Sequence, residues 1–533
     1  MTVSKISLTA AIIAVAAALV GLAPPARAIV EPVQQDPWKF DSATSMGQQE
    51  HVRQLIAQRR FDEALREIAA LQKAEPASAA VAILAGVVYV NKGDTVHARQ
   101  SFEQALALQP DSLAATLNLA QLDIYENKPD AARQRFERLL ASTPNNVDAM
   151  LGLAAVAAAQ NQDALYVQWL ERVLQTDPGR TRARVLLAKH YLDKKDVPKA
   201  LSIARQASEA DPKDTLALDV LGSAQLAARL PNDAVETYSR LTRVARDDPD
   251  AYYKLATAYV AANSLSAARA QLTHALLLKP DFLDAQVLLA TIELSSGRPA
   301  EALKIARAIE ARDPKSAAGL TLEGEARLAQ QDAAGAQKAF QAAWSIRPTG
   351  LLAMRQHQAL SRLGREAEGE AIVRGWLNDH HDDATTRLYL ASRYLAARHY
   401  DRAADEFRRV LQVEPRNVAA LNDLAWTYQQ LRDPRAVQTA ESAFALAPAD
   451  PQVMDTLGWI VLEKGDVSRA VDLLTKAADA SPQSDTIQYH LAVATNKSGD
   501  KARARRQLER LLASKKAFPQ RAEAEALLRT LPN

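Results

Sequence analysis

Small and apolar residues recur along the chain at the spacing of two successive helices joined by a short turn. Residues 79–110 show the unit: positions three or four apart form one apolar face in each half. These positions are Ala82, Ala85, Gly86 and Tyr89 in the first half, and Ala98, Phe102 and Ala105 in the second. Between them, Gly93 suits a left-handed helix end and Asp94 suits the next N-cap, while Pro110 ends the second helix. The pattern therefore predicts a pair of antiparallel helices.

The same unit returns about every 34 residues, which is the signature of a repeat array. Proline marks the end of most units, at Pro76, Pro110, Pro144, Pro178, Pro212, Pro280, Pro314, Pro348, Pro415, Pro448 and Pro482. Alanine keeps the same register inside the second helix, at Ala64, Ala98, Ala132, Ala200, Ala234, Ala268, Ala302, Ala336, Ala403, Ala436, Ala470 and Ala504. Two residue types in one register predict about fourteen helix pairs over residues 43–516.

The repeat resembles the tetratricopeptide repeat family, whose pattern is W-x₂-L-G-x₂-Y, then A-x₃-F, then P. One matching unit carries Leu390-Ala391 with Tyr394, then Ala403 and Phe407, then Pro415. The initial Trp is absent from most units. The resemblance implies an all-α, right-handed superhelical solenoid of antiparallel helix pairs, closed by a C-terminal capping helix.

Two units depart from the pattern. Tyr166 and Glu370 stand where alanine is expected, and the unit 349–381 also lacks a closing proline. We interpret 349–381 as an irregular repeat and a candidate hinge, although a repeat that has drifted and still stacks explains it equally well.

This interpretation divides the array into repeats one to nine, residues 43–348, and repeats eleven to fourteen, residues 382–516. Residues 517–533 are predicted to form the capping helix.

The N-terminus has the features of an export signal over residues 1–28. Lys5 precedes an uncharged run, and Ala26-Arg27-Ala28 fits a small-x-small cleavage site. An uncleaved anchor is the alternative, because the run is slightly longer than a usual signal core. Residues 29–42 are interpreted as a linker. We therefore expect a periplasmic or secreted protein with no membrane span once the signal is removed.

Composition narrows the function classes. The chain has 65 Lys+Arg against 63 Asp+Glu, and the two excess positive charges, Lys5 and Arg27, belong to the signal. Because no basic block remains, nucleic acid is not expected as a partner. The chain contains no Cys, which excludes disulfides, thiolate metal sites and Cys nucleophiles. Lack of Cys suits an oxidising compartment without proving one.

No catalytic or nucleotide-binding motif stands out, so neither an enzyme nor a bound cofactor is predicted. The densest polar cluster is Asp379-His380-His381-Asp382-Asp383, at a junction between units. A metal site there is conceivable, but adjacent His side chains on a helix diverge, which favours a solvated loop.

In the family that the repeats resemble, ligands bind along the first helix of each unit, beside the Leu-Gly/Ala pair. Transferred to this chain, that implies a partner-binding groove formed by Asn422, Trp426, Gln429, Asp455, Trp459, Tyr489 and Asn496. Trp426 and Trp459 occupy equivalent places in adjacent units. An exposed aromatic pair could stack on sugars or on apolar side chains, whereas buried rings would only fill space between helices. Weaker candidates are Asn118, Lys189, Tyr253 and Lys254.

The C-terminal repeats also resemble those of exported tetratricopeptide repeat proteins of bacterial exopolysaccharide and PEP-CTERM systems. The resemblance rests on Leu424-Ala425-Trp426, on Asp433-Pro434-Arg435-Ala436, on Asp455-Thr456-Leu457-Gly458-Trp459 and on Tyr489-His490-Leu491-Ala492. It implies a non-enzymatic scaffold that binds protein partners in an envelope assembly. A glycan-binding solenoid with an aromatic concave face is the alternative.

Overall fold

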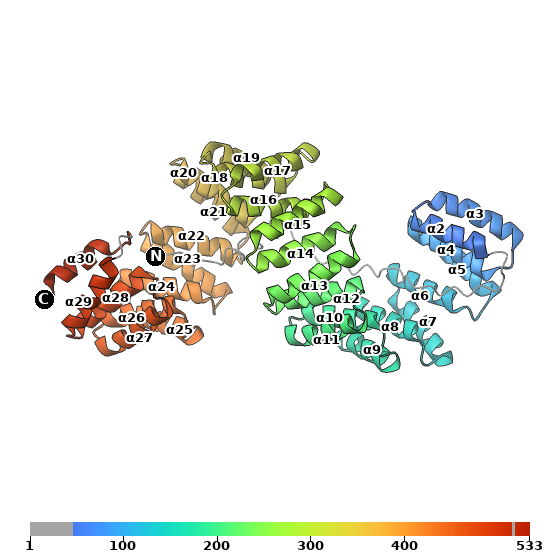
Figure 1. Ribbon diagram of the computed structural model, residues 1–533, viewed down its shortest axis with the longest axis horizontal. Helices are drawn as coiled ribbons and strands as arrows, with labels where there is room; N and C mark the ends of the chain where they lie inside the picture. Colours follow the sequence, from blue (N-terminus) through green and yellow to red (C-terminus); the bar gives the residue numbers. More distant parts are fainter. Residues whose placement is uncertain (1–45, 514–516, 533) are drawn as a thin grey trace. The chain divides into compact units, whose positions relative to one another are not determined.

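The computed structural model describes residues 46–513 and 517–532, and within these ranges the chain forms 29 α-helices and no strand (Figure 1). The predicted signal, 1–28, and linker, 29–42, lie outside the described residues. The first helices of the repeats are α2 (Met46–Ala57), α4 (Ala79–Lys92), α6 (Leu113–Tyr125), α8 (Val147–Ala159), α10 (Thr181–Asp193), α12 (Thr215–Ala227), α14 (Pro249–Ala261), α16 (Leu283–Ser295), α18 (Ala317–Ala329), α20 (Gly350–Arg362), α22 (Ala384–Ala396), α24 (Val418–Gln430), α26 (Pro451–Glu463) and α28 (Asp485–Lys497).

Each first helix is followed by a second helix, which completes the pair. These are α3 (Phe61–Ala74), α5 (Thr95–Leu108), α7 (Pro129–Ser142), α9 (Asp163–Thr176), α11 (Val197–Ala210), α13 (Pro231–Val244), α15 (Leu265–Leu278), α17 (Pro299–Arg312), α19 (Ala333–Ile346), α21 (Glu366–Asp379), α23 (Tyr400–Val413), α25 (Arg435–Leu446), α27 (Val467–Ala480) and α29 (Lys501–Ala513). A final helix, α30 (Arg521–Thr530), packs on α29. The prediction of an all-α array of helix pairs is therefore confirmed.

The alanines that set the register form the closest contacts inside each pair. Every one of the twelve predicted alanine positions is fully buried. A second helix contacts both the first helix before it and the first helix after it, as α5 does with α4 and α6. A methyl group is the largest side chain that lets two helix backbones approach so closely, and larger residues such as Phe102 fill the remaining space.

The turns inside the pairs follow the predicted chemistry only in part. Gly93 has a φ of 80° and ends α4, and the Asp94 side chain accepts a hydrogen bond from the His97 backbone N–H at 3.1 Å. One left-handed residue recurs in each of the fourteen turns, but only five of these residues are glycine. The other nine, such as Arg229 and Arg398, adopt a positive φ despite their side chains.

The irregular repeat requires a correction. The prediction that Glu370 occupies the alanine position is wrong, because Gly369 occupies the fourth position of α21, where the neighbouring second helices α19 and α23 have alanine. The connection from α19 to α20 is one residue shorter than its counterparts, which moves the register back by one. A Cβ on Gly369 would lie 2.8 Å from the Cα of His357, so the two helices are in close contact. Glu370 instead accepts a hydrogen bond from the Tyr394 hydroxyl at 2.5 Å.

The chain divides into two compact units, Met1–Ile292 and Glu293–Asn533. Each has its own apolar core: in the first, clusters such as that around Phe102 and Leu119, and in the second, a continuous cluster from Ala353 to Ala494. The repeat 349–381 lies within the second unit, and a hinge there stays a prediction. Among the described helices, none is both long and apolar enough to cross a lipid bilayer.

Candidate partner-binding surface

The seven predicted groove residues lie on three successive first helices of the second unit. We call the set the first-helix surface: Asn422, Trp426 and Gln429 on α24, Asp455 and Trp459 on α26, and Tyr489 and Asn496 on α28. All seven side chains are half-buried. Such side chains are held in place by their neighbours and still present atoms to a ligand.

Trp459 is supported by a buried histidine that the sequence analysis did not single out. The ring of His490 lies against Trp459, with centroids 4.1 Å apart. The Nδ1 atom of His490 lies 2.8 Å and 3.0 Å from the two carboxylate oxygens of Asp455. Since His490 is only 5% exposed, the Trp459 indole rests on a buried side chain that Asp455 holds in place. Asp455 is thus engaged in positioning Trp459.

Trp426 occupies the corresponding place on α24, and both Trp residues pack against the same core cluster of the second unit. Part of each ring is buried in that cluster, and part remains open to solvent. The pair is therefore neither fully exposed nor fully buried: each indole packs on the core with one part of its ring and remains accessible with another.

Two amide side chains flank Trp426 on α24. Asn422 Nδ2 donates to Asp423 at 3.4 Å, and Gln429 Nε2 donates to Glu463 on α26. The amide oxygens of Asn422 and Gln429 are buried and have no hydrogen-bond partner among the described residues. A buried acceptor without a donor is costly, and a rotation of either amide would be needed to bring its oxygen to a donor from a ligand or from water.

The α28 residues are less engaged with this cluster. Tyr489 packs against the core formed by α28, α29 and α30, and burial together with the charge of Glu523 raises the pKa of its hydroxyl. Asn496 is half-buried near the end of α28. The structure therefore brings together the residues of α24 and α26, and places Tyr489 toward the end of the array.

Polar pairs between successive first helices recur along the chain. Asp148 and Arg180 lie 2.7 Å apart, and Asp219 and Lys254 lie 2.8 Å apart. Gln429 with Glu463 and Asp455 with His490 continue the pattern in the second unit. Partners 32 to 35 residues apart in sequence thus meet on adjacent first helices or, for Arg180, at the N-cap of one. This spacing, about one repeat, places the partner of Asp455 near position 489 but does not by itself distinguish His490 from Tyr489.

The weaker candidates all lie on first helices of the first unit. Lys254 forms an ion pair with Asp219, and Tyr253 packs on Phe282 with ring centroids 5.3 Å apart. Burial raises the pKa of Tyr253 to about 12, helped by the charges of Asp284 and Asp250. Two further candidates lie on other helices of the first unit, Asn118 on α6 and Lys189 on α10.

The cluster 379–383 ends α21 and forms the turn before α22, and four of its five residues are exposed, as the solvated-loop interpretation predicts. Asp383 caps α22, accepting from the Thr386 backbone at 2.9 Å and from Trp376 Nε1 at 2.7 Å. Burial alone would raise the pKa of Asp383, but the hydrogen bonds from Thr386 and Trp376 outweigh it and hold that pKa below its usual range. His380 stacks on Trp376 with centroids 3.4 Å apart. In the described part of the chain, no group of His, Asp or Glu side chains is arranged to hold a metal ion.

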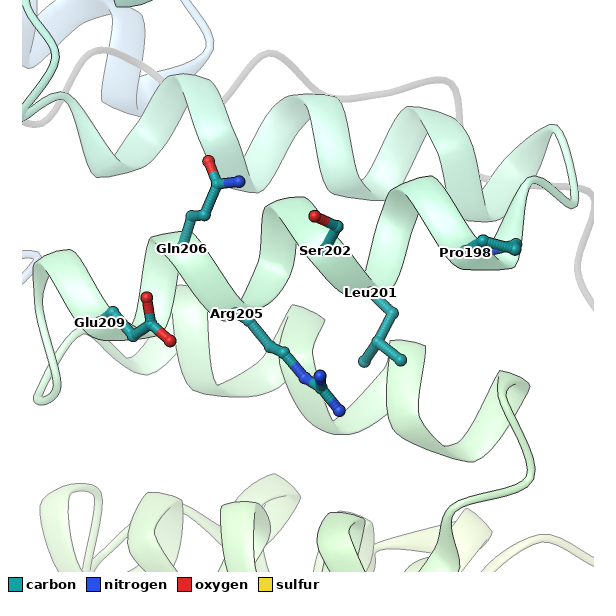
Figure 2. A pocket seen from close by; sticks show the side chains of 6 residues that line it. All are labelled: Pro198, Leu201, Ser202, Arg205, Gln206 and Glu209. Atoms are coloured by element: carbon teal, nitrogen blue, oxygen red, sulfur yellow. The ribbon is translucent and has the colours of Figure 1, made fainter.

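Figure 2 shows a surface depression in the first unit, along the exposed side of α11. Its lining comes from that helix alone: Pro198, Leu201, Ser202, Arg205, Gln206 and Glu209. Because no described residue of a second element faces these side chains, the depression has no opposing wall to enclose a small molecule.

Family models described as tetratricopeptide repeat match most of the array. The matched residues are 50–112, 89–154, 155–224, 220–281, 253–317, 388–453 and 461–529. They cover most of the described helix pairs in both units, including α24 and α28, whereas Asp455 and Trp459 on α26 lie between two matches.

A curated relative is the cellulose synthase 1 operon protein C of Komagataeibacter xylinus. It is 29% identical over 250 residues, which cover 42% of this chain and 18% of that protein. The chain thus matches less than a fifth of that relative's length.

Three solved structures are similar at low sequence identity. Yeast Tom70 has a TM-score of 0.43 and 14% identity, covering 86% of this chain and 96% of its own. Cut9–Hcn1 of the APC/C has a TM-score of 0.41 and 14% identity, covering 90% of this chain and 95% of its own. YrrB, described as a TPR protein with an unusual peptide-binding site, has a TM-score of 0.30 and 18% identity. The match covers 36% of this chain and 97% of YrrB.

Proposed function

Because the chain belongs to the tetratricopeptide repeat family, we propose that it is an exported, non-enzymatic scaffold that binds protein partners on its first-helix surface. The observation that carries the proposal is the half-buried Trp426 with the unpaired amide oxygens of Asn422 and Gln429 beside it. Once the two amides rotate toward the surface, backbone N–H groups of a bound segment would supply the missing donors, and its apolar side chains would pack on the indole.

Site-specific crosslinking tests this surface. Replacing Trp426 with the photo-reactive residue benzoylphenylalanine should give covalent adducts with a partner protein when whole cells are irradiated. The matched control carries the same residue in place of Phe444, a half-buried aromatic on the second helix α25. Adducts at both positions alike, or at neither, would argue against binding on the first-helix surface.

We further propose that the scaffold serves an exopolysaccharide assembly in the bacterial envelope. Support comes from the N-terminal signal pattern and from the relative that is named for a cellulose synthase operon. Fractionation of the producing cells, with mass spectrometry of the mature N-terminus, tests the export step. A cytoplasmic protein that begins at Met1 would overturn it.

A glycan ligand is the second candidate for the same surface. Trp426 and Trp459 occupy equivalent places on adjacent helices, and each presents part of its ring. Sugar rings stack on indoles, and their hydroxyl groups could donate to Asn422 and Gln429. Polysaccharide retention should then be lost in a Trp426→Ala/Trp459→Ala variant that still melts cooperatively, and kept in Trp169→Ala, a half-buried Trp of the first unit.

A further inference from the structure

Three arginines form a straight column on the exposed side of α29. Arg503, Arg506 and Arg510 are three and four residues apart, so they lie on one face over about 10 Å of helix. The opposite face, with Ala504 and Leu508, is buried in the core. The column therefore points away from the array.

The three guanidinium groups have no partner within the described chain. No ion pair or side-chain hydrogen bond involves Arg503, Arg506 or Arg510, and all three side chains are exposed. Arg505, on the flank of the same helix, shows the contrast: it pairs with Glu509 at 2.8 Å and donates to the carbonyl of Leu531 at 3.1 Å. The three arginines of the outward column are thus unpaired, whereas Arg505 on the flank is engaged.

Second helices of earlier repeats show what such an arginine binds. Arg469, at the third position of α27, pairs with Glu441 on α25 at 2.6 Å. Arg402, at the third position of α23, lies 3.7 Å from Glu370 on α21. In both cases a neighbouring helix supplies the carboxylate. Arg503 stands at the third position of α29 and lacks that carboxylate.

We propose that the Arg503–Arg506–Arg510 column docks an acidic helix of a partner protein. Carboxylates three and four residues apart on that helix would repeat the spacing of the column, and each guanidinium can bind one carboxylate with two parallel hydrogen bonds. This surface lies on a second helix and is separate from the first-helix surface, so the inference goes beyond the proposed function.

Other anionic partners fit the column less well. A membrane-binding face combines basic residues with exposed large apolar side chains, and none of the exposed large apolar side chains of the described chain lies on α29. Nucleic-acid binding depends on many phosphate contacts, usually with aromatic stacking, whereas this column offers three charges in a line.

Binding to designed peptides tests the proposal with the full chain. The probe is a labelled Ala-rich helical peptide with glutamates at i, i+3 and i+7, measured by fluorescence anisotropy. Its control is an isomer with the same glutamates spread around the helix. We expect tighter binding of the patterned peptide, weakened about tenfold in Arg503→Gln/Arg506→Gln/Arg510→Gln.

A charge-matched variant separates the column from general electrostatics. Arg138 on α7, Arg205 on α11 and Arg416 in the connection before α24 are exposed and far apart in sequence. The variant Arg138→Gln/Arg205→Gln/Arg416→Gln should therefore bind as the wild type does. Equal binding of both peptide isomers, or equal loss in both triple variants, would overturn the proposal. So would a preference for polygalacturonate or phosphatidylglycerol vesicles over the patterned peptide. Failure here leaves crosslinking at Trp426 unaffected.

Discussion

The phenyl ring of Phe102 on α5 occupies the space beside Gly86 on α4, so closely that a Cβ on Gly86 would lie 2.4 Å from the ring. The relationship recurs in the pair Gly324 and Phe340, where the distance would be 2.3 Å. A large side chain on the second helix is thus matched by a missing side chain on the first. This exchange of volume keeps the helix spacing constant between repeats.

Gly86→Ala should therefore destabilise the first repeats by ~1–3 kcal/mol, because overpacking outweighs the better helix propensity of alanine. Gly375→Ala is the control, since that glycine lies exposed within α21 with nothing within 4 Å of its Cβ position. It should stabilise α21 slightly. Hydrogen exchange over α4 and α5 measures the effect, and unchanged exchange in Gly86→Ala would contradict the packing argument.

The helix pairs could be predicted because their determinants are local. Alanine at the contact, an N-capping Asp such as Asp94, and proline after most second helices all act within one unit. The register error at Glu370 had a different origin: the connection before α20 is one residue short, and the packing of Gly369 on His357 shows which residue takes the contact position.

Substitutions at two left-handed turn residues should change the stability in opposite directions. Gly465 has a φ of 94° and Arg229 a φ of 59°. Gly465→Ala should cost ~1 kcal/mol, because a Cβ disfavours this conformation, whereas Arg229→Gly should stabilise by up to ~1 kcal/mol. Arg205→Gly, inside helix α11, should instead destabilise by ~1 kcal/mol. Thermal unfolding of the three variants distinguishes them, and a loss of stability in Arg229→Gly would refute the strain argument.

A buried carboxylate joins three helices of the first unit. Asp123 on α6 is 1% exposed and binds Arg99 of α5 at 2.6 Å and Arg135 of α7 at 2.8 Å. Removing the charge in Asp123→Asn leaves two arginines without their shared partner, so we expect a local loss of ~3 kcal/mol.

Hydrogen exchange over α5 to α7 should show that loss, because neighbouring repeats stack independently of distant ones. Asp111→Asn, at an exposed position in the turn before α6, should change stability by less than ~0.5 kcal/mol. Similar exchange in both variants would mean that the Asp123 ion pairs contribute little.

The positions of the candidate site residues could be predicted from the sequence, but the contacts between them could not. Trp426 and Trp459 follow from the repeat register. The support of Trp459 by His490 depends on a contact between two repeats, and the register alone assigns Tyr489, not His490, to the position equivalent to Asp455. Contacts between units depend on the rotation from one helix to the next, which no single unit encodes.

His357 on α20 is buried inside the irregular repeat and is 2% exposed. Its Nδ1 lies 2.7 Å from the Tyr389 hydroxyl, and its Nε2 lies 3.3 Å from Glu366. Burial lowers the pKa of His357, Glu366 and Glu370 act to raise it, and Arg393 acts to lower it further. Burial prevails, so the pKa of His357 in the folded chain lies below its usual value of 6.5.

The second unit should consequently lose stability as the pH falls below about 6.5. In that range the unfolded chain binds a proton at His357 that the folded chain resists, so unfolding takes up protons and becomes easier in acid. The stability that depends on His357 is fully present above this pH and decreases toward the lowered pKa of the folded state. His357→Gln should flatten the dependence of Tm on pH between about 7.5 and 5.5, whereas His381→Gln, at an exposed position, should leave it unchanged. Equal slopes for His357→Gln and the wild type would show that another group controls the acid sensitivity.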